Sequence, residues 1–136
     1  MRSRIGAGAS EVATSTTEGN TLIGFQSGNA LNGGSYNTAL GYQSANALNT
    51  GAFNVALGYQ AMLNATSSPF NVAIGYQALK GSATISNVGQ NIAIGYKALT
   101  ANAAGVQNIA LGHQALQSNT SGISNVALGS TALSSL

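Results

Sequence analysis

The sequence predicts an all-β protein, a parallel β-solenoid of about seven to eight coils of 17 residues. Three observations predict it: a nine-residue pattern that recurs at a nearly constant spacing, bulky residues two positions apart inside that pattern, and a repeat too short for a pair of helices. The pattern first begins at Asn20, and successive copies follow at 17, 17, 17, 20, 17 and 17 residues. A fixed period of this size is typical of a repeat architecture.

Residues 71–79, with the sequence Asn-Val-Ala-Ile-Gly-Tyr-Gln-Ala-Leu, represent the pattern, and we number its positions from the asparagine. Position two is Thr, Val or Ile, position three is Ala except at Leu22, and position four is Ile or Leu. Bulky residues two apart have the spacing of one strand face, and β-branched residues favour strands. Position five is always Gly, which predicts a corner, because glycine takes positive φ and allows close backbone approach.

A solenoid of helical hairpins is the alternative architecture, but each of its units needs about 33 or more residues. Coils of short parallel strands stacked at about 4.8 Å fit instead, and seven or eight of them make a rod roughly 35 Å long. An asparagine at the same place in every coil predicts a ladder of side-chain amides along the stack. Its members are Asn20, Asn37, Asn54, Asn71, Asn91, Asn108 and Asn125.

Residues 20–136 form the predicted solenoid of seven repeats, and residues 1–19 precede it. Ile5, Gly6 and Ala9 match the Ile, Gly and Ala positions of the pattern, so this first segment is either a degenerate opening repeat or a flexible leader.

Two irregularities bear on the coils. The copy that begins at Asn71 is three residues longer than the others, which predicts a surface bulge at a turn. The last copy stops at Leu136 without a polar cap, so either the protein continues or partner subunits cover an open edge there.

The composition argues against an enzyme. Charged residues make up 4% of the chain, Asp and Cys are absent, and there is one histidine. A Ser-His-acid site would have to join His113 to Glu11 or Glu18 across about six coils, or roughly 30 Å. We therefore expect no catalytic, metal or cofactor site.

Nucleic acid and the membrane interior are also unexpected partners. The net charge of +2 is small and dispersed, with no basic stripe for phosphates. No apolar run approaches the roughly 20 residues that a membrane helix needs.

Position six is aromatic in five copies and predicts a row of rings along the rod. If Tyr42, Tyr59, Tyr76 and Tyr96 are exposed, this row is a candidate surface-binding ladder that could stack on sugar rings. The alternative is that the rings pack against the adjacent coil or a neighbouring chain. His113 occupies the same position, where we expect it to replace Tyr in a structural role.

Over residues 20–136 the copies resemble the head repeats of YadA-like trimeric autotransporter adhesins, whose motif is close to Asn-Ser-Val-Ala-Ile-Gly. They are also similar to the Asn-Thr-Ala-Leu-Gly-Tyr-Gln repeats of bacteriophage tail fibres and other appendage proteins. The resemblance implies a left-handed β-roll and a homotrimer. By this analogy, positions two and four fill each roll, and the alanines at position three lie between chains.

The resemblance implies a structural and adhesive segment of an extracellular fibre, such as a phage tail fibre or appendage that presents a host-binding surface. The repeat is longer than in the bacterial heads, and no neck, stalk or anchor is seen, which places the phage or fibre reading first. A trimeric adhesin head and a filament subunit that stacks end to end are the alternatives. The expected partners are other copies of the chain and a host-surface glycan or protein. Ice binding needs regular Thr rows, but Thr occupies position two only at Thr21 and Thr38.

Overall fold

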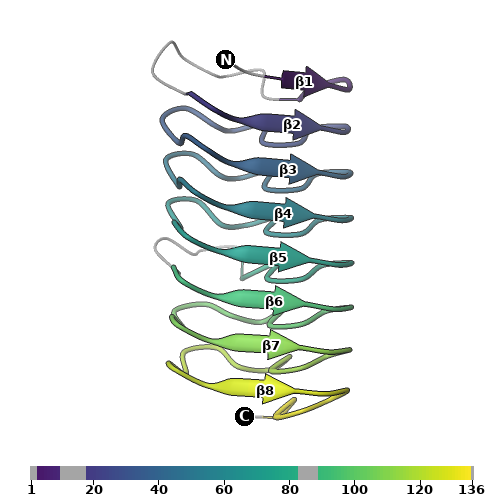
Figure 1. The fold of residues 1–136 in the computed structure, drawn as a ribbon, viewed down its shortest axis with the longest axis vertical. Coiled ribbons are helices and arrows are strands. Elements are labelled where there is room, and N and C mark those ends of the chain that lie inside the picture. Colours follow the sequence, from purple (N-terminus) through teal and green to yellow (C-terminus); the bar gives the residue numbers. More distant parts are fainter. Residues whose placement is uncertain (1–2, 10–17, 83–88, 136) are drawn as a thin grey trace.

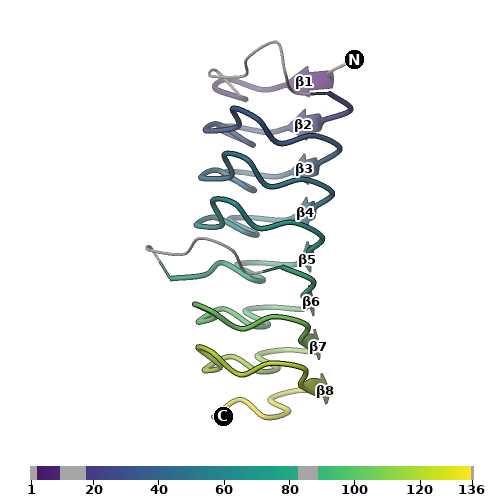
Figure 2. The ribbon, with the colours of Figure 1, turned by 90° about the vertical axis from the view of Figure 1, so that its left-hand side faces the viewer.

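The computed structural model describes residues 3–9, 18–82 and 89–135, and it confirms the predicted parallel β-solenoid (Figure 1). One sheet contains eight strands of three residues in the order β1 to β8, each parallel to the next. Each repeat makes one coil, and the coils stack along a single axis (Figure 2). The strands are β1 (Ser3–Ile5), β2 (Thr21–Ile23), β3 (Thr38–Leu40), β4 (Val55–Leu57), β5 (Val72–Ile74), β6 (Ile92–Ile94), β7 (Ile109–Leu111) and β8 (Val126–Leu128).

Each position of the pattern pairs with the same position in the next coil. Thr38 lies opposite Val55, and Leu40 opposite Leu57. β1 follows the same rule, with Ile5 opposite Ile23, so residues 3–9 begin a coil as the opening-repeat interpretation expects. Residues 10–17, the rest of that segment, lie outside the described residues.

The longer copy keeps the register as well, because Val72 of β5 pairs with Ile92 of β6. The backbone stays bonded to the next coil as far as Gly81, whose N–H donates to the carbonyl of Thr100. The predicted surface bulge spans residues 80–85, and residues 83–88 lie outside the described residues. The longer copy therefore leaves the pairing of β5 with β6 unchanged.

The glycine at position five is required both by its own conformation and by its neighbour. Gly41 has φ of 136°, a backbone conformation that other residues rarely adopt. A Cβ atom built on Gly41 would also lie 2.5 Å from the carbonyl oxygen of Gly58 in the next coil. The stacked corners thus leave no room for a side chain.

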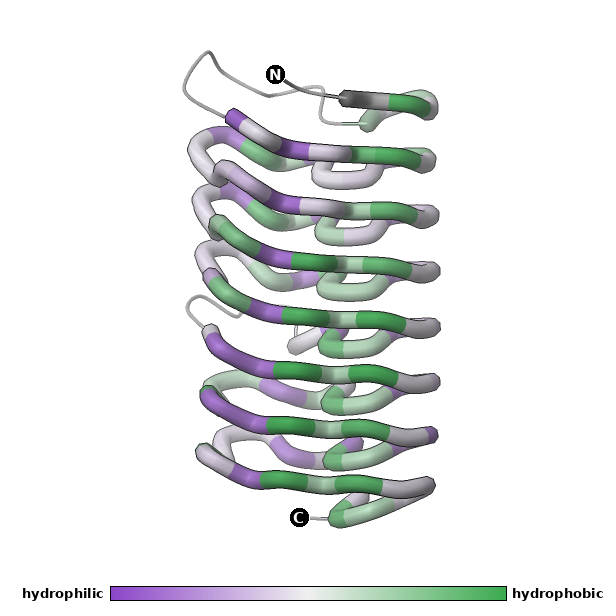
Figure 3. The backbone as a smooth tube through the Cα atoms, viewed as in Figure 1, coloured by the Kyte–Doolittle hydropathy of each residue, from purple (hydrophilic) through white to green (hydrophobic). Residues whose placement is uncertain are grey.

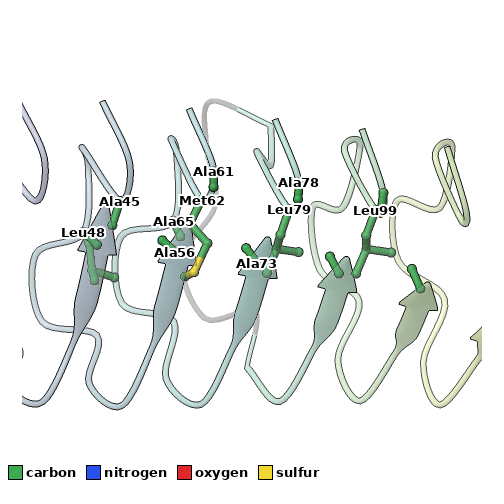
Figure 4. Packing of buried hydrophobic residues seen from close by; sticks show 14 of the residues in the cluster. Ala45, Leu48, Ala56, Ala61, Met62, Ala65, Ala73, Ala78, Leu79 and Leu99 are labelled. Carbon is green, nitrogen blue, oxygen red and sulfur yellow. The ribbon is translucent and has the colours of Figure 1, made fainter. Parts of the chain in front are cut away.

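The expected assignment of the two strand faces is wrong. Position three points into the coil: Ala39 and Ala73 are 0% exposed, and Leu22, in the same position, is 1% exposed. Positions two and four point outward, and Leu40 is 48% exposed. The physical reason is the narrow interior, where the strand residue lies against the return segment of the same coil and alanine fits in most coils (Figure 4). Leu22 fits because the return segment of its coil has a glycine there: a Cβ on Gly28 would lie 2.8 Å from Cδ2 of Leu22.

The core compensates for its alanines at two places in the return segment. Leu48 fills one coil, whereas Leu99 fills another from a position three residues earlier in the repeat. In the coils of β6 and β7 the leucine occupies the earlier position and the later one is a buried asparagine, Asn102 or Asn119, whereas the coil of Leu79 has the exposed Ser82 there. The Asn102 side-chain amide donates to the carbonyl of Gly105 at 2.8 Å, and its oxygen accepts the Gly105 N–H at 3.0 Å. Each coil therefore keeps a filled interior with its polar groups paired.

Candidate binding surface

The outward side of the sheet is a regular surface that recurs in each coil of the described residues. Exposure alternates along residues 36–42, where Tyr36, Leu40 and Tyr42 are exposed, while Asn37 and Ala39 are buried. The same alternation recurs in the following coils. We call the outward positions the outer face: the residue before each asparagine, and positions two, four and six. It is about 20 Å wide, because six residue steps of about 3.3 Å separate its two edges.

The middle of the outer face is aliphatic and carries no charge. In the coils of β4 to β8 it consists of Val55, Leu57, Val72, Ile74, Ile92, Ile94, Ile109, Leu111, Val126 and Leu128. Figure 3 shows these strand segments as the hydrophobic part of each coil. Ile94 is 37% exposed and Leu128 is 64% exposed, so aliphatic surface faces solvent along the rod.

The predicted tyrosine ladder lies along one edge of this face. Tyr42, Tyr59, Tyr76 and Tyr96 are each 42–44% exposed, and successive rings are 5.1–5.2 Å apart between centroids. Phe25 extends the row at one end, and His113 extends it at the other, 5.0 Å from Tyr96. The histidine is stacked in the place of a tyrosine, the position that the sequence suggests.

The stacking restricts what this ladder can bind. Its rings are nearly parallel, with interplanar angles of 6° between Tyr42 and Tyr59 and between Tyr59 and Tyr76. Each internal ring therefore turns its faces toward its two neighbours and its edge and hydroxyl group toward solvent. A sugar stacks on a free ring face. The ladder consequently suits an edge contact better than the sugar platform considered from the sequence.

A second aromatic ladder, which the sequence reasoning missed, lies along the opposite edge. Tyr36, Phe53 and Phe70 precede the asparagines of three successive coils, with centroids 5.1–5.2 Å apart and interplanar angles of 13° and 2°. They are 49–55% exposed, more than the tyrosines of the first ladder. The sequence feature that could have predicted this second ladder is the 17-residue spacing of its three aromatic residues.

A glutamine ladder next to the first aromatic row was also missed. Gln43, Gln60 and Gln77 each donate a side-chain amide hydrogen bond to the preceding glutamine oxygen, at 2.8–2.9 Å. Lys97 takes this position in the coil of β6, where its Nζ lies 5.4 Å from the centroid of the Tyr96 ring. These partly buried amides fix the flank of the aromatic row.

The asparagine ladder runs inside the rod, so it is structural and not part of the surface. Asn37 donates its backbone N–H and its side-chain amide to Oδ1 of Asn20, at 2.8 and 3.1 Å. The same pair of bonds recurs in four further steps of the ladder, and Asn91 makes the backbone bond to Asn71. All seven members have the hydrogen-bonded positions that the sequence predicts.

The charged groups that catalysis would need are not together. Glu18 precedes β2 and His113 follows β7, which places them five coil spacings, or about 24 Å, apart. Glu11 lies outside the described residues. Within residues 3–9, 18–82 and 89–135, no group of three His, Asp or Glu side chains could hold a metal ion. The surface of the same residues has no pocket.

Comparisons of the chain with models of protein families, with curated proteins and with solved structures found no match. In the described part of the chain, no helix has the length and apolarity to cross a membrane. The outer face is therefore the feature from which a function is inferred.

Proposed function

We propose that the chain is a structural and adhesive segment of an extracellular fibre, such as a phage tail fibre or a related appendage, and that it works as a homotrimer. The observation that carries the proposal is the outer face. From β2 to β8 it spans six coil spacings, about 29 Å, and with a width of about 20 Å its outline is roughly 600 Å². The apolar part is smaller than this outline, because Thr21, Thr38 and the polar edge residues of β6 to β8 lie within it. It falls in the range of the largest apolar patches on soluble monomers, which often mark interaction surfaces.

Other copies of the chain are the most natural cover for this surface. The strands stack in regular succession (Figure 1), and the face contains no Lys, Arg, Asp or Glu, so an equally regular face matches it along its length. Covering it on each of three chains would remove the exposed aliphatic positions from water, which favours association by about 25 cal/mol per Å² of apolar area. The strand residues that face outward in one chain would then form a shared core.

A fibre segment also accounts for the rest of the surface. The rod grows by about 4.8 Å for each repeat, so the number of repeats sets its length without changing its cross-section. Its polar surface depends on Asn, Gln, Ser and Thr, because only 4% of the residues are charged. Such a surface places few constraints on salt or pH in the medium that surrounds a fibre.

The structural part of the proposal is tested by negative-stain electron microscopy of purified protein. Short rods of uniform length support a fibre segment. Open-ended polymers that lengthen with protein concentration support the filament alternative and count against the proposal.

The adhesive part is tested with a glycan array and with host-cell binding. We expect any glycan binding to survive the double change Tyr59→Ser, Tyr76→Ser, because the faces of these rings are turned toward each other. If the double variant kept its oligomeric mass but lost glycan binding, the result would support the hypothesis that sugars stack on this ladder. The absence of binding to any glycan or host cell would contradict an adhesive role.

A further inference from the structure

We propose that copies of this chain meet edge to edge through the two aromatic ladders. Tyr36, Phe53 and Phe70 of one copy pack against Tyr42, Tyr59 and Tyr76 of the next copy, at the same level along the rod. The inference rests on the proposed homotrimer and adds the contact residues, the parallel orientation and the axial register.

The first observation is that the two edges match in composition at four of the seven levels from β2 to β8; at β2, Gly19 lies at the level of Phe25. At β3, β4 and β5 both edges are aromatic: Tyr36 with Tyr42, Phe53 with Tyr59, and Phe70 with Tyr76. At β6 one edge has Gln90 and the other has Tyr96, and at β7 one edge has Gln107 and the other has His113. At β8 both edges are serine, Ser124 and Ser130. A parallel arrangement in register pairs rings with rings at β3 to β5 and serine with serine at β8. A shift of one level would keep rings opposite Tyr36, Phe53 and Phe70, but it would separate Ser124 from Ser130.

The second observation is that the two ladders have the same repeat. Centroids are 5.1 and 5.2 Å apart along Tyr36, Phe53 and Phe70, and 5.1–5.2 Å apart along the tyrosine row. Two rows of equal spacing stay in step over their whole length. Both rows expose ring edges, and aromatic rings in protein interfaces contact each other favourably in edge-to-face and offset arrangements.

The third observation concerns the width of the outer face. Three faces about 20 Å wide that meet at their edges enclose a triangular prism, and each face then lies about 6 Å from the shared axis. Packed sheets are about 10 Å apart, so each side chain layer fills about 5 Å. Val, Ile and Leu at positions two and four would therefore fill the prism, and the aromatic ladders would close its corners. Four such faces would lie about 10 Å from the axis and leave a hole.

An arrangement in which one edge meets the other edge of the next copy is heterologous, and it closes into a ring when the rotation divides a full turn. The occupant of each aromatic edge is thus a second copy of the same chain. Removal of both aromatic ladders should weaken the assembly more than removal of the glutamine ladder Gln43, Gln60 and Gln77.

The absence of cysteine from the sequence allows a direct test by site-specific crosslinking. The double variant Tyr36→Cys, Tyr42→Cys is treated with a short bismaleimide, and the products are separated on a denaturing gel. Within one chain the two thiols are about 20 Å apart, beyond the reach of the reagent. The matched control is Tyr36→Cys, Tyr96→Cys, whose sites lie on the same two edges but three coils apart along the axis. The molar mass of each variant is measured by light scattering before crosslinking.

A covalent band of three chains from the 36/42 variant, with single chains from the 36/96 variant, is the expected result. Crosslinked pairs from Tyr36→Cys alone would indicate that like edges meet, and a strong product from the 36/96 variant would indicate another register; either result overturns the proposal. A three-chain mass without a 36/42 crosslink would overturn the edge contact and leave the homotrimer standing. A one-chain mass for the unmodified protein would overturn the homotrimer itself.

A second measurement covers the case in which the cysteine variants do not assemble. Photo-oxidation of the unmodified protein should join Tyr36 of one copy to Tyr42 of the next as dityrosine, and Tyr36→Phe should remove most of the multi-chain product while keeping the ring. Multi-chain products that are unchanged in Tyr36→Phe would contradict the assignment of this edge.

Discussion

Oδ1 of Asn54 accepts two hydrogen bonds from Asn71 in the next coil, one from the backbone N–H at 2.9 Å and one from the side-chain amide at 3.2 Å. The amide of Asn54 in turn donates to Oδ1 of Asn37 at 3.0 Å and to the carbonyl of Ser68 at 2.7 Å. Asn54 is 1% exposed. One uncharged side chain thus links three successive coils and satisfies the buried backbone at the start of each strand.

The first prediction is that Asn54→Ala lowers the free energy of unfolding by about 2–4 kcal/mol, because it leaves several buried donors and acceptors unpaired. Asn125→Ala is the matched control, since Asn125 donates to Asn108 but no bond to its own Oδ1 occurs within the described residues. Urea denaturation measures both variants. Equal losses of stability in the two variants would show that hydrogen bonds to the coils on both sides of Asn54 add nothing over the bonds to one side that Asn125 makes.

The second prediction separates two requirements at position five. Gly75 and Gly129 have similar φ, 127° and 117°, but a Cβ on Gly75 would lie 2.6 Å from the carbonyl oxygen of Gly95, whereas one on Gly129 meets nothing within 4 Å. Backbone strain alone costs about 1–3 kcal/mol. We expect Gly129→Ala to lose about that much, and Gly75→Ala to lose several kcal/mol more or fail to fold. Thermal unfolding measures the stability of both variants. Equal losses of stability would show that the clash with the Gly95 carbonyl does not contribute.

The third prediction tests which strand face is internal. Ala73 is 0% exposed and its coil interior is filled, so Ala73→Leu should destabilise the protein by about 1–3 kcal/mol or more through overpacking. Val72 faces outward, and Val72→Ala should cost the single chain less than about 1 kcal/mol. Both variants are compared with the unmodified protein at one protein concentration, because association shifts apparent stability. If Val72→Ala lost more stability than Ala73→Leu in a monomeric sample, the result would show that the valines, and not the alanines, face the interior.

The fourth prediction concerns salt. The outer face from β2 to β8 contains no Lys, Arg, Asp or Glu. Screening by salt weakens contacts between charges and leaves apolar contacts intact. The molar mass of the assembly should therefore stay constant between low salt and about 1 M NaCl. Dissociation on raising the salt concentration would show that charged groups such as Lys80 and Lys97 hold the copies together.

The repeat period was sufficient to predict the coils, because a 17-residue unit with one glycine corner and one strand has few other ways to bury its residues. The asparagine ladder followed from the same period. The direction of the strand faces did not, because alternation separates two faces but does not say which one is internal. That depends on the width of the coil, and here the return segment lies so close that alanine fills the inward position in most coils, while the one leucine there, Leu22, lies against Gly28.

The second aromatic ladder was missed for a related reason. Tyr36, Phe53 and Phe70 occupy the last position of the repeat, outside the nine-residue pattern, and only three coils have a ring there. These residues also have positive φ, from 59° to 60°, which sequence preference does not assign to aromatic residues. The fold places this row on the same face as Tyr42 and Tyr59.

The most direct test of the central claim, that other copies of the chain cover the outer face, is the molar mass of the purified protein by light scattering. The chain mass is 13.5 kDa, and we expect a discrete species of about 40 kDa over a wide range of protein concentration. A stable species of one chain, with the outer face left in solvent, would contradict the claim.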